Sequence, residues 1–167
     1  MKQIVAVDLN WGIGRDNDML ISIPDDMKFF VEQTRGKTVI MGKNTLFSLP
    51  GAKPLKNRRN IVISSSLEDR DDLIIVRSID ELLEEVKKYP SDELMVIGGA
   101  SIYKKLLDYS SECIVTKIEK SFSDVHVYFP NLDQKENWEM VEKSEIHEWE
   151  GIKYYFTRYK NHSVKKK

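Results

Sequence analysis

The sequence predicts a single α/β domain with a central, mostly parallel eight-stranded sheet, flanked by helices and ending in an antiparallel C-terminal hairpin. Two observations carry this prediction. Short apolar runs of strand length alternate with helix-forming segments along most of the chain, which is typical of a parallel sheet. The last part has two alternating segments around the turn Glu150-Gly151, which indicates a hairpin. Since 167 residues are the size of one domain, we expect a domain over 1–162 and a solvated basic tail over 163–167.

The expected strands are short runs rich in Val, Ile, Leu and Met. They span residues 3–8, 38–41, 60–64, 73–76, 94–97 and 113–116, followed by 138–142 and 153–157 in the hairpin. Helices are predicted to begin at Pro24, after Gly42, at the Ser78–Glu81 capping box and after Gly99. Ligands of such sheets bind at the carboxyl ends of the strands, so site residues are expected in the turns that follow them.

The first helix has clear start and stop signals. Pro24 suits its first turn, Ser22 or Asp25 is expected to cap the free amides, and Gly36 ends it. The spacing i, i+3, i+4, i+7 predicts a core-facing stripe. This stripe consists of Met27, Phe30, Val31 and Thr34.

Asp26 lies at the edge of that apolar stripe. A carboxylate placed there loses hydration, which raises its pKa and suits it to exchange a proton or to bind a cationic heterocycle. The alternative interpretation is that Asp25 and Asp26 merely complement the helix dipole in the first turn.

The overall composition excludes several classes of protein. The 26 basic and 27 acidic side chains give a net charge of −1, which argues against a protein that binds nucleic acid through bulk charge. Cys113 is alone, and His126, His147 and His162 lack ligand spacing, so we expect neither a disulfide nor a metal site. No apolar run approaches the ~20 residues of a membrane span, and the first residues lead straight into a strand. A cytoplasmic protein is therefore expected.

Two turns between a strand and a helix are suited to phosphate binding. Gly98-Gly99 follows the most apolar strand and opens a helix, where small residues and free amides admit a phosphate. Thr45 occupies a similar turn. The first loop is not a conventional dinucleotide fingerprint, because Asn17 stands where Gly12-x-Gly14 would need its third glycine.

Further cations and hydroxyls stand near other strand ends. Lys43, Ser64, Ser65 and Arg77 together suit the 2′-phosphate of an NADP-type cofactor. The pair Arg58-Arg59 could offer a guanidinium fork to a carboxylate. Taken singly, each of these side chains is also compatible with an ordinary solvated surface position.

In their order along the chain, these segments closely resemble the dihydrofolate reductase family. The resemblance covers residues 3 to about 160. It is carried by Ile4-Val5-Ala6-Val7, Trp11-Gly12-Ile13-Gly14, Pro24-Asp25-Asp26-Met27-Lys28-Phe29-Phe30, Val39-Ile40-Met41-Gly42-Lys43-Asn44-Thr45, Arg58-Arg59-Asn60-Ile61-Val62-Ile63-Ser64 and Val96-Ile97-Gly98-Gly99-Ala100-Ser101-Ile102-Tyr103.

The resemblance implies NADPH-dependent reduction of 7,8-dihydrofolate to tetrahydrofolate, by a monomer that antifolates inhibit. Asp26 resembles the buried acid that binds the pterin and promotes protonation of N5, with Thr116 as its supporting hydroxyl. Arg58 resembles the arginine that holds the glutamate carboxylate of the substrate, and Gly98-Gly99 a pair joined by a cis peptide. The implied pocket walls are Val5, Ala6, Phe30, Leu49, Leu55, Ile97 and Tyr103. The implied cofactor-binding residues are Ala6, Ile13, Gly14, Lys43, Asn44, Thr45, Ser64, Ser65, Arg77, Ile97, Gly98, Gly99, Ala100, Ser101, Ile102 and Tyr103.

The chain departs from the family pattern in two places. Residues 10–23 resemble the mobile loop that closes over the nicotinamide, but Ile21 replaces the tryptophan that the family commonly carries before the helix proline. Isoleucine has no N–H with which to hold a water molecule. The segment between Thr45 and Arg58 is also slightly longer than in compact relatives.

Two other functions remain open at this point. A pyrimidine reductase of riboflavin synthesis with the same fold would keep the Gly98-Gly99 turn but would not need an acid on the first helix. A catalytically silent nucleotide-binding module would bind NADPH without turnover, and Ile21 alone supports it. The combination of Asp26 with Arg58 favours dihydrofolate reduction.

Overall fold

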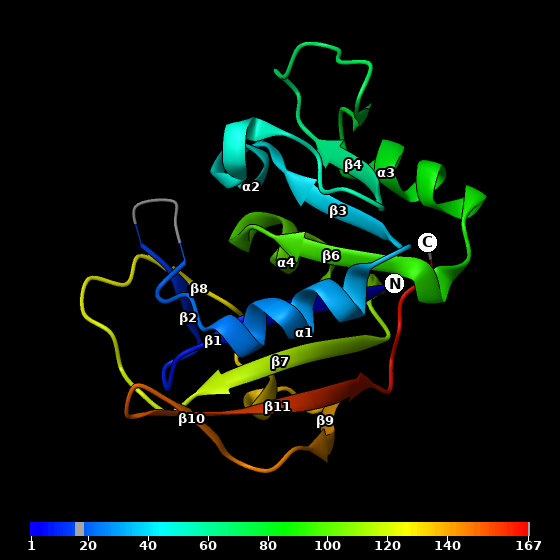
Figure 1. The fold of residues 1–167 in the computed structure, drawn as a ribbon. Coiled ribbons are helices and arrows are strands. Elements are labelled where there is room, and N and C mark those ends of the chain that lie inside the picture. Colours follow the sequence, from blue (N-terminus) through cyan, green and yellow to red (C-terminus); the bar gives the residue numbers. More distant parts are fainter. Residues whose placement is uncertain (16–18, 167) are drawn as a thin grey trace.

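The computed structural model describes residues 1–15 and 19–166 and confirms the predicted fold class. Within these residues, nine strands form one sheet in the order β10-β11-β7-β1-β6-β3-β4-β5, with β9 paired to β11 beside this path (Figure 1). The strands of this sheet are β1 (Lys2–Val7), β3 (Thr38–Gly42), β4 (Arg59–Ile63), β5 (Ile74–Val76), β6 (Leu94–Gly98), β7 (Glu112–Ile118), β9 (Trp138–Lys143), β10 (His147–Trp149) and β11 (Ile152–Asn161). Asn17 and Lys167, on which two of the sequence-based expectations rest, lie outside the described residues.

Helices and short turns connect these strands. The α-helices are α1 (Pro24–Thr34), α2 (Lys43–Ser48), α3 (Ile79–Glu85) and α4 (Ala100–Leu106). Single 3-10 turns lie at Pro50–Ala52, Val86–Lys88, Ser91–Glu93, Leu107–Tyr109 and Leu132–Gln134. A separate small sheet pairs β2 (Gly12–Gly14) with β8 (Val127–Tyr128).

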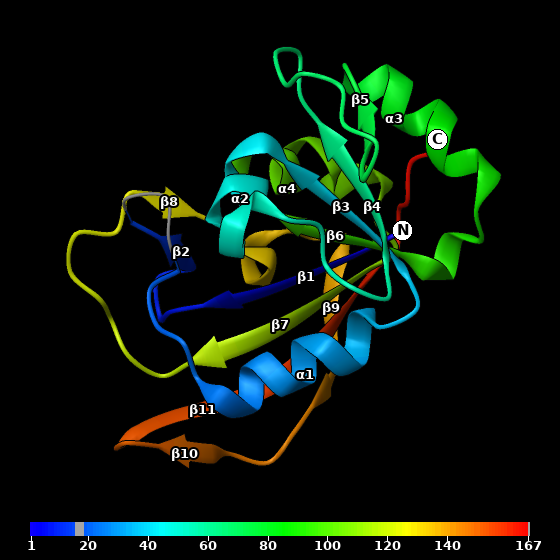
Figure 2. The ribbon, with the colours of Figure 1, turned by 45° about the horizontal axis from the view of Figure 1, so that its top comes forward.

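The centre of the sheet is parallel and buried on both faces. β1 pairs in parallel with β6 and β7, and β3 pairs in parallel with β4 and β6. The strand β3 is buried at every position, which is why its sequence is continuously apolar instead of alternating. These parallel strands have their carboxyl ends at one edge, followed there by α2, α4 and the loop after β4 (Figure 2).

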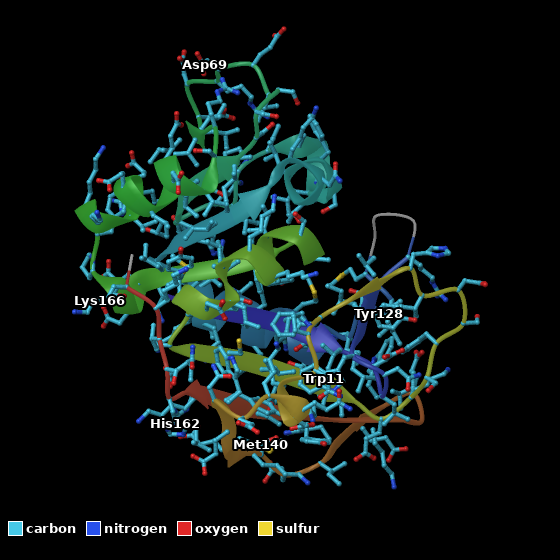
Figure 3. The ribbon with its side chains drawn as sticks, turned by 180° about the vertical axis from the view of Figure 1, so that it is seen from behind. Trp11, Asp69, Tyr128, Met140, His162 and Lys166 are labelled. Atoms are coloured by element: carbon cyan, nitrogen blue, oxygen red, sulfur yellow. The ribbon has the colours of Figure 1, made fainter. Side chains whose placement is uncertain are left out.

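The sheet carries a layer of apolar side chains on each of its two faces. One contains Ile40, Val96 and side chains of α3 and α4, such as Leu82 and Leu106. The other contains Val39, Met41 and Leu46 of α2, with Phe29 and Phe30 of α1 packed against them. On the first face, Trp11 stacks on Phe129 with ring centroids 6.2 Å apart. Figure 3 views the molecule from behind and shows Asp69 and Met140 at opposite ends of it.

The C-terminal strands differ from the simple hairpin in one detail. The turn Glu150-Gly151 joins β10 to β11, whereas β9 pairs with the other end of β11 across a register shift between Arg158 and Tyr159. The strand β10 was not predicted, and it adds a ninth strand to the eight that were. Beyond β11, the backbone N–H of Lys165 donates to the carbonyl of Asp108 at 2.7 Å.

The structure overturns the expected cap of the first helix. Ile23 is the N-cap residue of α1, and no side chain caps this end. Neither Ser22 nor Asp25 serves as the cap, because Asp25 Oδ2 instead accepts a hydrogen bond from the Tyr154 hydroxyl at 3.0 Å. The expected end of the helix is confirmed, since Gly36 has a left-handed φ of 73°.

Substituting Ile40 tests how much the central layer stabilises the fold. Ile40 has no exposed surface, so we expect Ile40→Ala to lower the free energy of unfolding in urea by about 2–5 kcal/mol. Ile146→Ala is the matched control, because Ile146 is 54% exposed and the same truncation there should change stability by less than about 0.5 kcal/mol. Equal losses for the two variants would contradict this description of the core.

Candidate active site

Asp26 and Thr116 are brought together from opposite halves of the chain. Asp26 lies in the first turn of α1, which crosses the sheet face, and Thr116 is a buried residue of β7. The Thr116 hydroxyl donates to Asp26 Oδ1 at 2.6 Å. Among the residues that the structure describes, no hydrogen bond is made to Asp26 Oδ2, so this oxygen is available to a ligand.

Two features of the environment of Asp26 change the pKa of its carboxyl group in opposite directions. Burial raises the pKa of Asp26 above its ordinary value, while the hydrogen bond from Thr116 lowers it; burial has the larger effect. This agrees with the expectation drawn from the position of Asp26 beside an apolar stripe. The result is a carboxyl group that is more readily protonated than an exposed aspartic acid.

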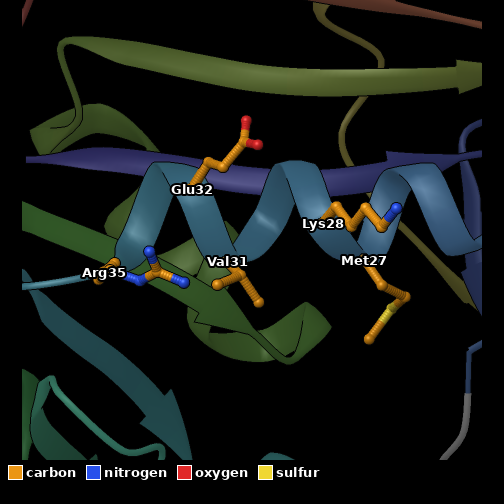
Figure 4. Close-up of a pocket in the computed structure, with 5 residues that line it drawn as sticks. All are labelled: Met27, Lys28, Val31, Glu32 and Arg35. Carbon is orange, nitrogen blue, oxygen red and sulfur yellow. The ribbon is translucent and has the colours of Figure 1, made fainter.

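The apolar stripe of α1 faces the core at Phe30 and Thr34, as predicted, but borders a groove at Met27 and Val31. Of its four members only Thr34 is buried, and Met27 is 40% exposed. Met27 and Val31 point from the same side of α1 in Figure 4 and line a groove of about 330 Å³ with Lys28, Glu32 and Arg35. An apolar surface left open next to a carboxylate is a suitable wall for a flat, partly polar ligand.

Most of the predicted pocket walls gather on one face of the sheet. Phe30, Leu49, Leu55 and Ile97 all pack against the apolar layer that contains Met41. Val5 and Tyr103 belong to the layer on the opposite face, and Ala6 packs with Ile23 in a third cluster. The structure therefore brings together the first four, but it does not bring Val5 and Tyr103 to the same wall.

The two neighbouring arginines have different surroundings. Arg58 Nε donates to Thr34 Oγ1 at 2.8 Å, which joins it to the end of α1. Burial, and then the nearby charge of Arg35, lower the pKa of Arg58. The guanidinium of Arg59 instead lies 4.1 Å from the ring centre of Tyr89. Of the fork proposed from the sequence, only Arg58 therefore contacts α1.

The turn at Gly98-Gly99 is packed closely against side chains of α2 and α4. The peptide bond between these two glycines is cis, as the resemblance implied. A Cβ added to Gly98 would lie 3.3 Å from the Tyr103 ring and 3.4 Å from Thr45 Oγ1. Thr45 thus faces this turn from α2, whereas Ile102 and Tyr103 are buried beneath it and Ala100 and Ser101 begin α4.

The predicted cations and hydroxyls meet in the loop after β4. Arg77 donates from Nη1 to the carbonyls of Ser64 and Leu67, and from Nη2 to Asp69 Oδ1 at 2.9 Å. Lys43 Nζ lies 3.2 Å from Ser66 Oγ. Arg77 therefore shapes this loop in addition to any ligand contact, while Asn44 and Ser65 are exposed at its edge.

The sequence analysis missed two residues, one in the loop after β4 and one beside β2. Ser66 is the hydroxyl that Lys43 contacts, and its place in a run of three serines was the available signal. Asp8 is buried and accepts backbone N–H bonds from Asn10, Gly12 and Phe122. It thereby positions β2, which carries Ile13 and Gly14, and no local pattern indicated this.

Two general findings concern the described residues as a whole. Within residues 1–15 and 19–166 there is no group of three or more His, Cys, Asp or Glu side chains that could hold a metal ion. No helix in the described part of the chain is long and apolar enough to span a membrane.

Comparison with known proteins assigns the family. The family model described as dihydrofolate reductase matches residues 1–161. The dihydrofolate reductase of Bacillus subtilis is 37% identical over 140 residues, which cover 83% of this chain and 79% of the relative. That of Haemophilus influenzae is 36% identical over 137 residues, covering 82% of each chain. The dihydrofolate reductase of Sus scrofa is 32% identical over 182 residues, covering 96% of this chain and 97% of the relative. This chain, with its acid on α1 and its glycine turn after β6, belongs to the dihydrofolate reductase family.

Proposed function

We propose that this protein reduces 7,8-dihydrofolate to 5,6,7,8-tetrahydrofolate with NADPH. The observation that carries the proposal is the half-buried carboxylate of Asp26, which Thr116 holds in the first turn of α1, one residue before Met27 of the groove. A carboxylate complements the paired N–H donors of the pterin edge, and the groove accepts the rest of a flat aromatic ligand. We further propose that it works as a monomer in the cytoplasm.

The donor set after β3, β4 and β6 fits NADPH. The Gly98-Gly99 turn, where Gly98 has a left-handed φ of 125°, suits a pyrophosphate that approaches the start of α4. Lys43, Ser66 and Arg77 supply cations and a hydroxyl for a 2′-phosphate. When bound, the dihydronicotinamide supplies the hydride that reduces C6 of the substrate.

The side chains of this protein bind and orient the substrate and supply a proton. Both carboxylate oxygens of Asp26 accept from the pterin edge, while the hydrogen bond from Thr116 to Oδ1 keeps the carboxylate oriented. The raised pKa of Asp26 favours delivery of a proton toward N5 of the pterin. Arg58, anchored on Thr34 at the far end of α1, holds the glutamate carboxylate of the substrate.

The two alternative functions have less support. A pyrimidine reductase does not need a half-buried acid on α1 that Thr116 holds, or Arg58 at the far end of that helix. A silent nucleotide-binding module would not require the pKa of Asp26 to be raised. If NADPH binds but only a pyrimidine substrate is reduced, the first alternative holds; if it binds and neither substrate is reduced, the second holds.

The proposed function is tested by following the absorbance of NADPH with and without dihydrofolate. We expect oxidation only when dihydrofolate is present. Asp26→Asn should lose about 10²–10⁴-fold in turnover at neutral pH, because an amide neither delivers the proton nor accepts both pterin hydrogen bonds. Its affinity for NADPH should be unchanged.

Asp80→Asn is the matched control for this experiment. Asp80 is an exposed acid in the first turn of α3, so it complements a helix dipole without lining the groove. It should keep full activity. Turnover of Asp26→Asn at the level of the unmodified protein would contradict the role assigned to Asp26.

The raised pKa of Asp26 predicts a dependence of stability on pH. Burial favours the protonated form in the folded state, so the ionised carboxylate destabilises the fold above that raised pKa. Stability from this group is fully present below the ordinary pKa of aspartic acid and is lost as the pH rises through the raised one. Asp26→Asn should therefore unfold at a higher urea concentration than the unmodified protein at pH ~7.5, with the difference shrinking toward pH ~4. A variant that is less stable at the higher pH would refute this.

Arg77→Ala should weaken NADPH binding by about 10–100-fold and NADH binding far less, since charge-assisted hydrogen bonds contribute about 1.5–3 kcal/mol each. The measurement is the dissociation constant of each cofactor from protein fluorescence. Arg70→Ala is the control, because Arg70 also ties down this loop, through Asp72 and the carbonyl of Ala52. Equal losses for NADPH and NADH in Arg77→Ala would remove Arg77 from the 2′-phosphate site.

A further inference from the structure

The first turn of α1 depends on tertiary contacts for its position. Its N-cap residue, Ile23, has no side chain that could accept a hydrogen bond, and only its carbonyl takes part, accepting from the N–H of Met27 at 3.0 Å. A helix that begins without a side-chain cap is not fixed locally at that end. Since Asp26 lies in this turn, whatever holds the turn also determines where the carboxylate of Asp26 lies.

Two consecutive acids connect this turn to two neighbouring strands. Asp26 accepts from Thr116 of β7 at 2.6 Å, and Asp25 accepts from the hydroxyl of Tyr154 of β11 at 3.0 Å. In the antiparallel pair of β7 and β11, Thr116 lies opposite Phe156, and Tyr154 lies opposite Ile118. Because side chains alternate along a strand, all four residues lie on the same face of the sheet, the face toward α1. The two hydrogen bonds thus hold the turn at two separate points.

Tyr154 is itself held firmly. It has no exposed surface and belongs to a cluster with Ile23 and Ile118. The His147 ring stacks on it with centroids 5.5 Å apart, and the Phe156 ring meets it edge-on at 5.8 Å. Such packing leaves the hydroxyl little freedom, so it provides a fixed point for Asp25.

We propose that Tyr154 is a positioning residue for the active-site acid: by holding Asp25, it fixes the first turn of α1 and so keeps Asp26 in hydrogen-bond contact with Thr116. The inference deepens the proposed function and rests on it for the role of Asp26. Nothing in the sequence adjacent to either residue indicates the contact, because the two partners are 129 positions apart.

The charges around Tyr154 and Asp26 predict how the pKa of Asp26 changes when Tyr154 no longer holds Asp25. Burial, the hydrogen bond to Asp25 and the charges of Asp25 and Asp26 raise the pKa of Tyr154 to about 12, so its phenol remains a donor throughout the neutral range. Among the described residues, the charges of Asp25 and Asp26 on α1 act on Tyr154, and the ring of His147 on β10 stacks on it. The hydrogen bond from Thr116 lowers the pKa of Asp26 against the effect of burial. If the turn loosens and that bond lengthens, the pKa of Asp26 should rise further.

The decisive variant is Tyr154→Phe, which removes the hydroxyl and keeps the ring in its cluster. With ¹³C-labelled aspartate, the carboxyl signal of Asp26, assigned by its loss in Asp26→Asn, should titrate at a higher pH than in the unmodified protein. The limb of the pH–rate profile for dihydrofolate reduction that reports this group should move in the same direction. We expect kcat/KM at neutral pH to fall about 2–10-fold, as for a misplaced catalytic group, with unchanged affinity for NADPH.

Tyr155→Phe is the matched control. Tyr155 is the next residue of β11 and points to the opposite face of the sheet, where Lys143 Nζ lies 4.6 Å from its ring centre. The same atom is removed from the same strand, so a general loss of stability would affect both variants. Only Tyr154→Phe should change the titration of Asp26.

A double-mutant cycle with Asp25→Ala completes the test. If Tyr154 acts through Asp25, the double variant should titrate as Tyr154→Phe does, with no additional shift. An unchanged Asp26 titration in Tyr154→Phe, or fully additive shifts in the cycle, would overturn the proposal. The carboxyl titration does not require turnover, so it can support this inference even if the unmodified protein fails to reduce dihydrofolate and the proposed function is wrong.

Discussion

The position of the candidate catalytic acid depends on one interaction, the hydrogen bond between Asp26 and Thr116. A carboxylate that has lost part of its hydration must keep a polar partner, and Thr116 on β7 is the partner that the sheet provides. This bond holds the first turn of α1 against β7, while Met27 and Val31 of the same helix line the groove. The acid and the groove therefore belong to the same helix.

The other half of the site follows from the parallel sheet. The strands β3, β4 and β6 end at one edge, so residues far apart in sequence, such as Thr45 and Gly98, become neighbours there. The loop after β4 has no helix to order it and is instead organised around the Arg77 guanidinium. Because Arg77 both holds this loop and belongs to the proposed phosphate site, binding of the cofactor is linked to the structure of the loop.

The sequence predicted those features that repeat along the chain or follow from local turn chemistry. Continuous apolar runs revealed the central strands, and glycine after a strand marked the turn at Gly98. The strands β2, β8 and β10 were not predicted, because two or three residues cannot establish a period. The stripe on α1 faces the core only at Phe30 and Thr34, since periodicity identifies an apolar face without saying what covers each of its members. Asp8 and Ser66 were missed because their partners are backbone amides or a distant lysine.

Asp25 and Asp26 have different partners, and the sequence around them could not have predicted which partner each one has. They are identical side chains at adjacent positions in the first turn of one helix, and dipole arguments treat them alike. What distinguishes them is a rotation of about 100° around the helix axis, which directs one toward Thr116 and the other toward Tyr154. Those two hydroxyls are brought side by side only by the pairing of β7 with β11, in which Tyr154 and Thr116 share one face. The functions of the two acids are therefore assigned by the register of strands that lie some ninety or more positions further along the chain.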